Sequence, residues 1–339
     1  MIIVAKASNT EREVLFGNAA ERTGINNPAI VEKDFWVCFV LDYLFHGSPW
    51  PKSFIFKGGT SLSKAYHAIE RFSEDIDLIM DWRLLGYSIH EPWEERSKTQ
   101  QDKFHKKIVA ETSAFLSNTL VPQMLKDMKS IVGENVDVSM DPDDKEQCTV
   151  NFYYPHVFNT GYLRQEIRLE IGPLAEWVPS HGVLISSTAA EQFPSAFIQP
   201  ATEVPTVDIE RTFWEKITIL HKTAASFEQK GIPSRYARHY YDIYQMSHSD
   251  VKEKSFRRKE LLEQDVKFKQ KFYYAKNASY ETAQIGTLRL VPCETAIKNL
   301  RADYDHMKDM IYGAKPSFDE VIAEIAKLEK EINGLASKE

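Results

Sequence analysis

Cysteine and long apolar runs are scarce in this 339-residue sequence, and each absence excludes a class of protein. The three cysteines, Cys38, Cys148 and Cys293, are far apart and form no C-x-x-C pair, which excludes a disulfide framework and a structural zinc site. No apolar run approaches the ~18 residues of a membrane helix, and the N-terminus lacks the basic and apolar regions of a secretion signal. We therefore expect a soluble, cytoplasmic protein without a membrane partner.

An excess of positive charge is also missing. The formal net charge is -7 and the pI is near 5.9, so any surface that binds nucleic acid must be local. The phosphate-binding loop G-x-x-x-x-G-K-[ST] is absent too, which excludes the P-loop class of NTPases.

The composition that is present predicts a globular protein. Hydrophobic residues make up 43% of the chain, which is ample for a packed core, and the length suggests two lobes or one lobe with a large extension. Hydrophobic periodicity and turn signals predict helices over residues 10–21, 29–45, 98–131, 207–246 and 318–333, and strands over 53–56, 76–80, 149–154 and 165–171. The acidic turn at residues 141–144 reads as a solvated hairpin tip.

Residues 54–81 combine three features in a short span. An apolar, strand-like run meets the turn Gly58-Gly59-Thr60-Ser61, a helix is expected over residues 62–70, and Asp75-Ile76-Asp77 begins a strand. Alternation places Asp75 and Asp77 on one face of that strand. Paired carboxylates are hard oxygen ligands that suit Mg²⁺, and a Gly-rich turn that opens a helix offers amide groups to phosphate. Alone, each feature is commonly a plain turn or a solvated strand edge, but together they predict metal-dependent transfer from a nucleoside triphosphate.

A third carboxylate is expected on the strand at 165–171. Glu166, Arg168 and Glu170 alternate there with apolar residues and so share one face. A two-metal transferase commonly takes a third carboxylate from a neighbouring strand. Glu170 is the first choice and Glu166 the reserve, while the alternative is that this face is simply solvated.

The order of turn, helix and Asp-x-Asp strand resembles the polymerase-β-like nucleotidyltransferase superfamily. More closely, residues 57–78 (KGGTSLSKAYHAIERFSEDIDL) are similar to the first motif of the AbiEii/AbiGii nucleotidyltransferase toxins of type IV toxin–antitoxin systems. The segments 213–224 (FWEKITILHKTA) and 234–246 (SRYARHYYDIYQM) are also similar to that family, as are residues 30–45 and 300–313.

This resemblance implies an α+β fold: a mixed nucleotidyltransferase sheet flanked by helices in residues 1–200, with N-terminal helices, and a helical C-terminal domain in residues 201–339. It implies a nucleotidyltransferase that uses Mg²⁺ to transfer NMP from an NTP to an acceptor, with RNA and the tRNA 3′ end as the favoured acceptor class. Such a protein would inhibit growth as the toxin of a phage-defence or toxin–antitoxin system, with a cognate antitoxin as a partner.

The residues that would do this form two groups. The catalytic set is Asp75, Asp77, Glu170, Lys216 and Asp242, of which Asp75, Asp77 and Glu170 hold the metal; Lys216 and Asp242 are assigned by the resemblance. The nucleotide-binding set is Lys57, Gly58, Gly59, Thr60, Ser61, Lys64 and Arg238, the last of these one helical turn before Asp242.

The sequence leaves several alternatives for the molecule that accepts the nucleotide. A basic cluster runs from Lys252 to Lys276, and Phe268, Phe272, Tyr273 and Tyr274 interleave with its second half, which suits RNA, although acidic residues dilute it. A protein or small-molecule acceptor is the first alternative. A non-catalytic module that binds NTP or RNA is the second, and a glycosyltransferase with Asp-x-Asp is a distant third.

Overall fold

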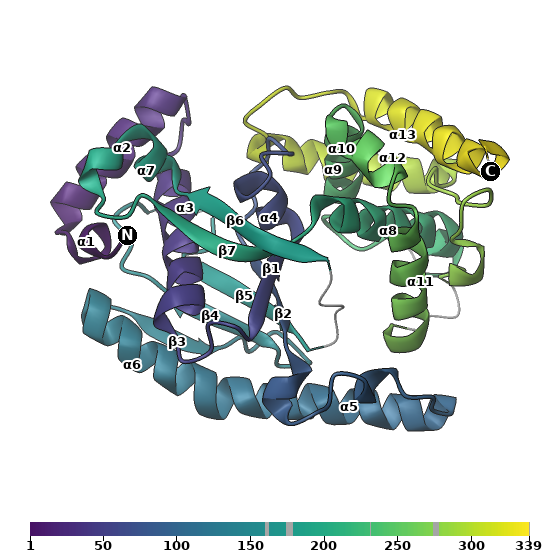
Figure 1. Ribbon diagram of the computed structural model, residues 1–339. Helices are drawn as coiled ribbons and strands as arrows, with labels where there is room; N and C mark the ends of the chain where they lie inside the picture. The colour runs from purple at the N-terminus through teal and green to yellow at the C-terminus, as the bar shows by residue number, and fades with distance from the viewer. Residues whose placement is uncertain (160–162, 174–178, 231, 274–277, 339) are drawn as a thin grey trace. The chain divides into compact units, whose positions relative to one another are not determined.

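The computed structural model describes residues 1–159, 163–173, 179–230, 232–273 and 278–338 (Figure 1). The chain forms two compact units. The first contains residues 1–65 and 73–207, and the second contains residues 66–72 and 208–339. The predicted boundary after residue 200 lies just before a strand that belongs to the first unit, and residues 66–72 join the second unit although they precede the Asp75 strand.

The first unit is built around a mixed sheet of seven strands in the order β3-β4-β5-β2-β1-β7-β6. The strands are β1 (Phe54–Lys57), β2 (Ile76–Met80), β3 (Asp137–Met140), β4 (Thr149–Tyr153), β5 (Glu166–Gly172), β6 (Ser180–Ser186) and β7 (Ala201–Val207). The β2–β5 and β1–β7 pairs are parallel, and the other pairs are antiparallel. This sheet confirms the predicted α+β class.

The helices of the first unit are α1 (Ile2–Lys6), α2 (Asn9–Thr23), α3 (Pro28–Asp42), α4 (Gly58–Lys64), α5 (Lys98–Phe115), α6 (Val121–Val132) and α7 (Thr188–Gln192). Local sequence explains their starts. Ser8 and Glu11 form a capping box at α2, and Asn27 caps α3 ahead of Pro28.

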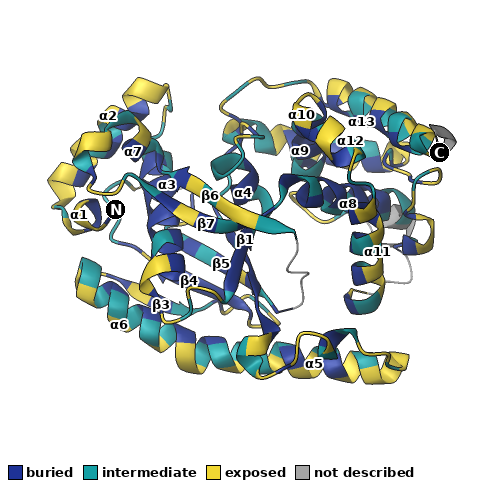
Figure 2. Cartoon of the chain, in the orientation of Figure 1, coloured by how far each residue is buried: buried dark blue, intermediate teal, exposed yellow. Residues whose placement is uncertain are grey.

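Helix α3 forms the centre of the first core. Its residues are buried almost throughout, as the dark blue ribbon in Figure 2 shows. The side chains of Phe35, Trp36 and Phe39 belong to the same apolar cluster as the inner residues of β2 and β5, among them Leu78 and Leu169. Burial of this apolar surface fixes which face of the sheet is covered, so the polar residues that alternate with it lie on the opposite face.

The second unit is helical, as expected from the sequence. It contains α8 (Ile209–Lys230), α9 (Ala237–Ser247), α10 (Asp250–Phe256), α11 (Glu260–Phe272), α12 (Glu294–Met307) and α13 (Phe318–Asn333). The apolar residues of α13 that recur at helical spacing, Val321, Ile325, Leu328 and Ile332, are all buried. No described helix of either unit combines the length and apolar character needed to cross a membrane.

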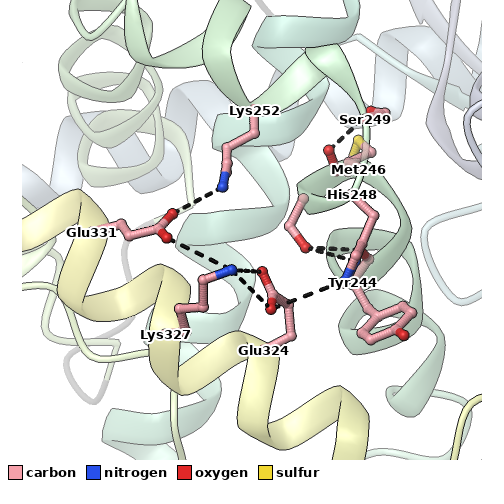
Figure 3. A network of polar contacts seen from close by, with 9 residues as sticks. Tyr244, Met246, His248, Ser249, Lys252, Glu324, Lys327 and Glu331 are labelled. Carbon is pink, nitrogen blue, oxygen red and sulfur yellow. Dashed lines mark hydrogen bonds and ion pairs between the residues drawn. The ribbon is translucent and has the colours of Figure 1, made fainter.

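Polar contacts tie α13 to α9 and α10 at the surface of this unit (Figure 3). Lys252 of α10 lies 3.0 Å from Glu331, and Lys327 bridges Glu331 and Glu324 on α13. His248, which follows α9, lies 4.0 Å from Glu324. These side chains are partly exposed. The contacts therefore help to align α13 with α9 and α10 but contribute little to the free energy of folding.

Three local predictions were wrong. The helix expected over residues 62–70 instead spans Gly58–Lys64, and His67, with φ 48°, lies in the segment that belongs to the second unit. Strands β6 and β7 were not predicted. Proline is unusual inside a sheet, yet Pro205 lies within β7, opposite Gly182 of β6.

Candidate functional site

A row of side chains crosses four strands of the first unit. Lys57 of β1 is the register partner of Asp77 in β2, and Asp77 is the register partner of Glu170 in β5. Glu170 is in turn opposite Thr149 of β4. Register partners share one face of a sheet at about 5 Å between Cα atoms. The fold therefore brings Lys57, Asp77 and Glu170 together from three separate segments of the sequence.

The other two predicted carboxylates differ in their distance from this row. Asp75 precedes Asp77 by two residues on the same face, and its Oδ1 lies 3.8 Å from Nε of Arg168. Glu166 lies four residues before Glu170, opposite Tyr153, with its carboxylate 3.7 Å from Arg164. Asp75 is thus adjacent to the row, whereas Glu166 is two pleats away from it.

The row borders a cavity of about 640 Å³. Besides Lys57, Asp77, Thr149 and Glu170, its lining includes Arg164, Arg168, Cys148 and residues 143–145 of the turn between β3 and β4. A cavity of this size falls within the range of small-ligand sites.

The acidic turn at residues 141–144 is only in part the solvated tip that the sequence suggested: Asp143 is exposed, but Asp141 is buried. Asp141 is only 3% exposed, and its Oδ2 lies 2.5 Å from Nη1 of Arg168. Asp144 accepts hydrogen bonds from the Cys148 amide and the Thr149 hydroxyl. Asp141 could not be recognised as a buried charge from the sequence. A buried carboxylate needs a counter-charge, and the partner of Asp141 belongs to a strand that is distant in the chain.

Gly58 brings the turn directly against Asp77. Its φ of +82° lies in the left-handed region, and a Cβ at this position would lie 1.9 Å from Oδ2 of Asp77. Only glycine avoids both the backbone strain and this collision. Gly58 therefore lets the start of α4 approach the carboxylate.

The hydroxyl groups of the turn are directed inward. Thr60 Oγ1 donates to the carbonyl oxygen of Asp75 at 2.5 Å, and Ser61 Oγ donates to the carbonyl of Gly58 at 2.8 Å. Both side chains are fully buried. Helix α4, which contains Gly59 as its second residue, begins without a side-chain cap. The Thr60 hydroxyl therefore fixes the turn to the Asp75 segment, and the Ser61 hydroxyl stabilises the turn itself.

Lys64 is held by α3. Its ammonium lies 2.6 Å from Oδ1 of Asp34, and its side chain is 12% exposed. Burial alone would lower the pKa of Lys64, but Asp34 outweighs it and raises the pKa. The structure therefore gives Lys64 a structural partner inside the first unit.

In the second unit, Lys216 of α8 and Asp242 of α9 form a buried ionic cluster with Arg71. Lys216 Nζ lies 2.8 Å from Oδ2 of Asp242. Arg71 donates to both oxygens of the same carboxylate, at 2.7 Å from Nε and 2.8 Å from Nη2. Arg71 was not predicted; the available signal was Asp242 itself, a carboxylate among apolar residues that needs a strong cation.

The electrostatics of this cluster follow from burial and from an excess of cations. Burial alone would raise the pKa of Asp242, but Arg71 and Lys216 outweigh it and hold the pKa well below its ordinary range. Burial and Arg71 lower the pKa of Lys216. His239 Nδ1 lies 3.4 Å from Lys216 Nζ, and burial, followed by the charges of Lys216 and Arg238, lowers the pKa of His239 well below 6.5. Two cations, Arg71 and Lys216, face the one carboxylate of Asp242, and this excess of positive charge suits an anion.

The carboxylate row has the right donors for a divalent cation. Among the described residues, no three His, Cys, Asp or Glu side chains converge as a ready-made metal centre. Asp77 and Glu170 nevertheless are register partners that line the cavity, and Asp75 precedes Asp77 by two residues on the same face; carboxylate oxygens are the ligands that Mg²⁺ prefers. The donor types of these residues therefore suit a magnesium ion.

The basic cluster of the second unit is largely neutralised. Arg258 lies 2.7 Å from Asp208, and Lys269 lies 3.0 Å from Asp265. Phe268 and Phe272, which were expected to stack on bases, are 4% and 5% exposed and belong to the core. Arg257, Lys267 and Tyr273 are exposed. Tyr274 and Lys276 lie outside the described residues.

Comparison with known proteins adds family information to this geometry. The family model described as "Nucleotidyl transferase AbiEii toxin, Type IV TA system" matches residues 42–324. Among solved structures, the chain is similar to MenT4, a nucleotidyltransferase toxin from Mycobacterium tuberculosis H37Rv, at 13% identity and a TM-score of 0.41, over 94% of this chain and 98% of that chain. None of the curated proteins matches this sequence.

Proposed function

We propose a reaction for this chain, which belongs to the AbiEii family of nucleotidyltransferase toxins of type IV toxin–antitoxin systems. In this proposal the protein uses Mg²⁺ to transfer NMP from an NTP to an RNA hydroxyl. The observation that carries the proposal is the row in which Lys57, Asp77 and Glu170 are register partners beside a cavity. The tRNA 3′ end is the acceptor that we favour.

The residues of the row, and Asp75 and Gly58 beside it, have distinct tasks in this reaction. Asp75, Asp77 and Glu170 would hold Mg²⁺, which when bound neutralises phosphate charge and favours in-line displacement at the α-phosphorus. Gly58 admits the start of α4 next to Asp77, and Lys57 supplies a positive charge to the phosphates from the neighbouring strand. A new bond forms between the acceptor oxygen and the α-phosphorus, the bond to the β-phosphate breaks, and pyrophosphate leaves. A carboxylate of the row takes up the acceptor proton.

We further propose that Lys216 and Asp242 are needed for nucleotide use, since their segments resemble functional segments of the family. The excess of cations around Asp242 supports this assignment, because phosphates are the groups that such an excess attracts. Arg71 fixes the carboxylate, and Arg238 and His239 belong to the same group of side chains.

The family also implies partners and a setting. A type IV toxin has a cognate antitoxin and uses a nucleotide substrate. The targets of an RNA nucleotidyltransferase are in the cytoplasm, where we propose that this protein acts. Growth inhibition would follow from blocking the tRNA 3′ end.

A protein or small-molecule acceptor is the second candidate. The observations that favour it are the pairing of Arg258 and Lys269 with acidic residues and the burial of Phe268 and Phe272, which weaken the basic and aromatic surface expected for RNA. The net charge of -7 has the same consequence.

The test is transfer of label from each NTP, labelled at the α-phosphate, in the presence of Mg²⁺. Total RNA, total protein and a small-molecule extract are the separate acceptor arms. Asp77→Asn and Glu170→Gln should each abolish transfer, because members of one site act as a unit. Glu166→Gln is the matched control and should retain most activity, since Glu166 lies two pleats from the row.

Each outcome has a defined meaning. Label in RNA that is lost with Asp77→Asn supports the proposal, and label only in protein or small molecules selects the second candidate. Wild-type transfer by a folded Asp77→Asn variant, or equal losses at Glu166 and Glu170, would refute the assignment of the row.

A further inference from the structure

Arg168 is a cation in the middle of the carboxylates that would hold the metal. It projects from β5 on the same face as Glu170, two residues away. Its Nε lies 3.8 Å from Oδ1 of Asp75, and its Nη2 lies 3.6 Å from Oε1 of Glu170. Its side chain is 18% exposed and borders the cavity of the site.

A guanidinium at this place has two opposed effects. It relieves the repulsion between neighbouring carboxylates, but it also repels a divalent cation and competes for the same oxygens. The distances to Asp75 and Glu170 are long for ion pairs, so a small rotation of the Arg168 side chain would bring it into full contact with either carboxylate.

Asp141 restrains that side chain. Its Oδ2 lies 2.5 Å from Nη1 of Arg168, which is the shortest of the three distances from this guanidinium to a carboxylate. Asp141 itself is fixed, because its Oδ1 accepts the amide of Asp143 at 2.9 Å and its own amide donates to the carbonyl of Thr149. It is also 3% exposed, so the pair is shielded from solvent screening.

We propose that Asp141 is a positioning residue that holds Arg168 to one side and neutralises it, so that Asp75 and Glu170 stay available to a divalent cation. Without Asp141, Arg168 moves onto Asp75 or Glu170 and the cation must displace it. This inference rests on the proposed function of the carboxylate row. It means that the turn between β3 and β4 helps to set the affinity of that row for a divalent cation.

The decisive variant is Asp141→Asn, which keeps an oxygen acceptor for the Asp143 amide but removes the charge that binds Arg168. Divalent binding is measured directly, with Mn²⁺ by electron paramagnetic resonance and with Mg²⁺ by calorimetry, in the full chain without nucleotide. We expect Asp141→Asn to weaken binding about 10- to 100-fold, the usual effect of residues that orient metal ligands. The Mg²⁺ concentration needed for half-maximal transfer should rise in parallel, with transfer recovering at high Mg²⁺.

A double-mutant cycle separates this role from a structural one. If Arg168 is the competitor, Arg168→Gln should restore most of the cation binding that Asp141→Asn removes, so the two effects are not additive. Glu146→Gln removes the same charge from an exposed position of the same turn that does not line the cavity, and it should change binding far less. If Asp141→Asn does not fold, Arg168→Lys takes its place: it keeps the charge, removes the guanidinium nitrogen that lies against Asp141, and should weaken binding in the same direction.

The results distinguish the inference from the function that it rests on. Wild-type cation affinity in a folded Asp141→Asn variant, or the same loss with and without Arg168→Gln, overturns the positioning role while the proposed function stands. A wild-type protein that binds no divalent cation and transfers no nucleotide overturns the proposed function, and this inference with it.

Discussion

At the scale of single residues, Gly58 shows how one missing side chain shapes the site. A Cβ here would lie 1.9 Å from Oδ2 and 2.5 Å from Cγ of Asp77, and the backbone φ is +82°. The carboxylate and the start of α4 share the space that any other residue would fill. The glycine is therefore required by the position of Asp77, in addition to the turn geometry.

We predict that Gly58→Ala lowers nucleotide transfer about 100-fold, because a displacement of roughly 1 Å in a positioning group has effects of that size. Gly86→Ala is the matched control, since Gly86 has φ +90° but a Cβ added there would meet no heavy atom within 4 Å. Both variants should lose about 1–2 kcal/mol from left-handed strain, as measured by denaturant unfolding. Equal activities of the two variants would show that contact with Asp77 is unimportant.

At the scale of elements, residues 66–72 form a segment that connects α4 to β2 and belongs to the second unit. The Phe72 amide donates to the carbonyl of Met310 at 2.8 Å, and the Tyr312 amide donates to the carbonyl of Glu70 at 3.0 Å. Arg71 forms an isolated bridge with Ile311, and its side chain binds Asp242. The backbone between the two nucleotidyltransferase motifs is thus part of the helical unit.

Arg71→Met should destabilise the second unit by about 3–5 kcal/mol, because it leaves the buried carboxylate of Asp242 with only one of its two cationic partners. Arg301→Met also breaks an ion pair, the exposed one with Asp319, and should have a much smaller effect. Denaturant unfolding followed by far-UV circular dichroism measures both. A loss at Arg71 no larger than that at Arg301 would mean that Lys216 alone compensates Asp242.

At the scale of the whole molecule, the buried His221 and the partly buried His239 predict how stability depends on pH. Burial lowers the pKa of His221, and burial with nearby cations lowers the pKa of His239. In the unfolded chain both take up a proton near pH 6.5, while the native protein does not. The unfolded state then binds more protons, so stability falls as pH decreases from about 7 to 5, by at most about 1.4 kcal/mol per pH unit for each histidine.

His239→Gln should reduce the slope of unfolding free energy against pH in this window, since it removes one of the two groups. His90→Gln, at an exposed position, is the control and should leave the slope unchanged. Unfolding free energies at half-unit pH steps between 5 and 7 provide the measurement. An unchanged slope for His239→Gln would mean that His239 is protonated in the native protein.

Local patterns were reliable where they coincided with burial. Residues 76–80 and 318–333 were predicted as a strand and a helix with the bounds that the structure has, because apolar periodicity there matches one buried face. Periodicity failed at residues 66–70 and at β7, where contacts with distant segments outweigh local preference: residues 66–72 pair with 310–313, and β7 lies between β1 and β6. The family was also readable from sequence, since its motifs are contiguous.

Local sequence was sufficient to predict the alternation that puts Asp75 and Asp77 on one strand face, the apolar faces of α3 and α13, and the family. These features depend on residues that are only a few positions apart, and the periodicity of a strand or helix is enough to fix how such residues are arranged. Three further features became visible in the folded chain: Lys57, Asp77 and Glu170 form one row, Asp141 pairs with Arg168, and Arg71 pairs with Asp242. Each of these pairings joins residues that are far apart in the chain, and buried charges acquire their partners only when the strands and helices pack.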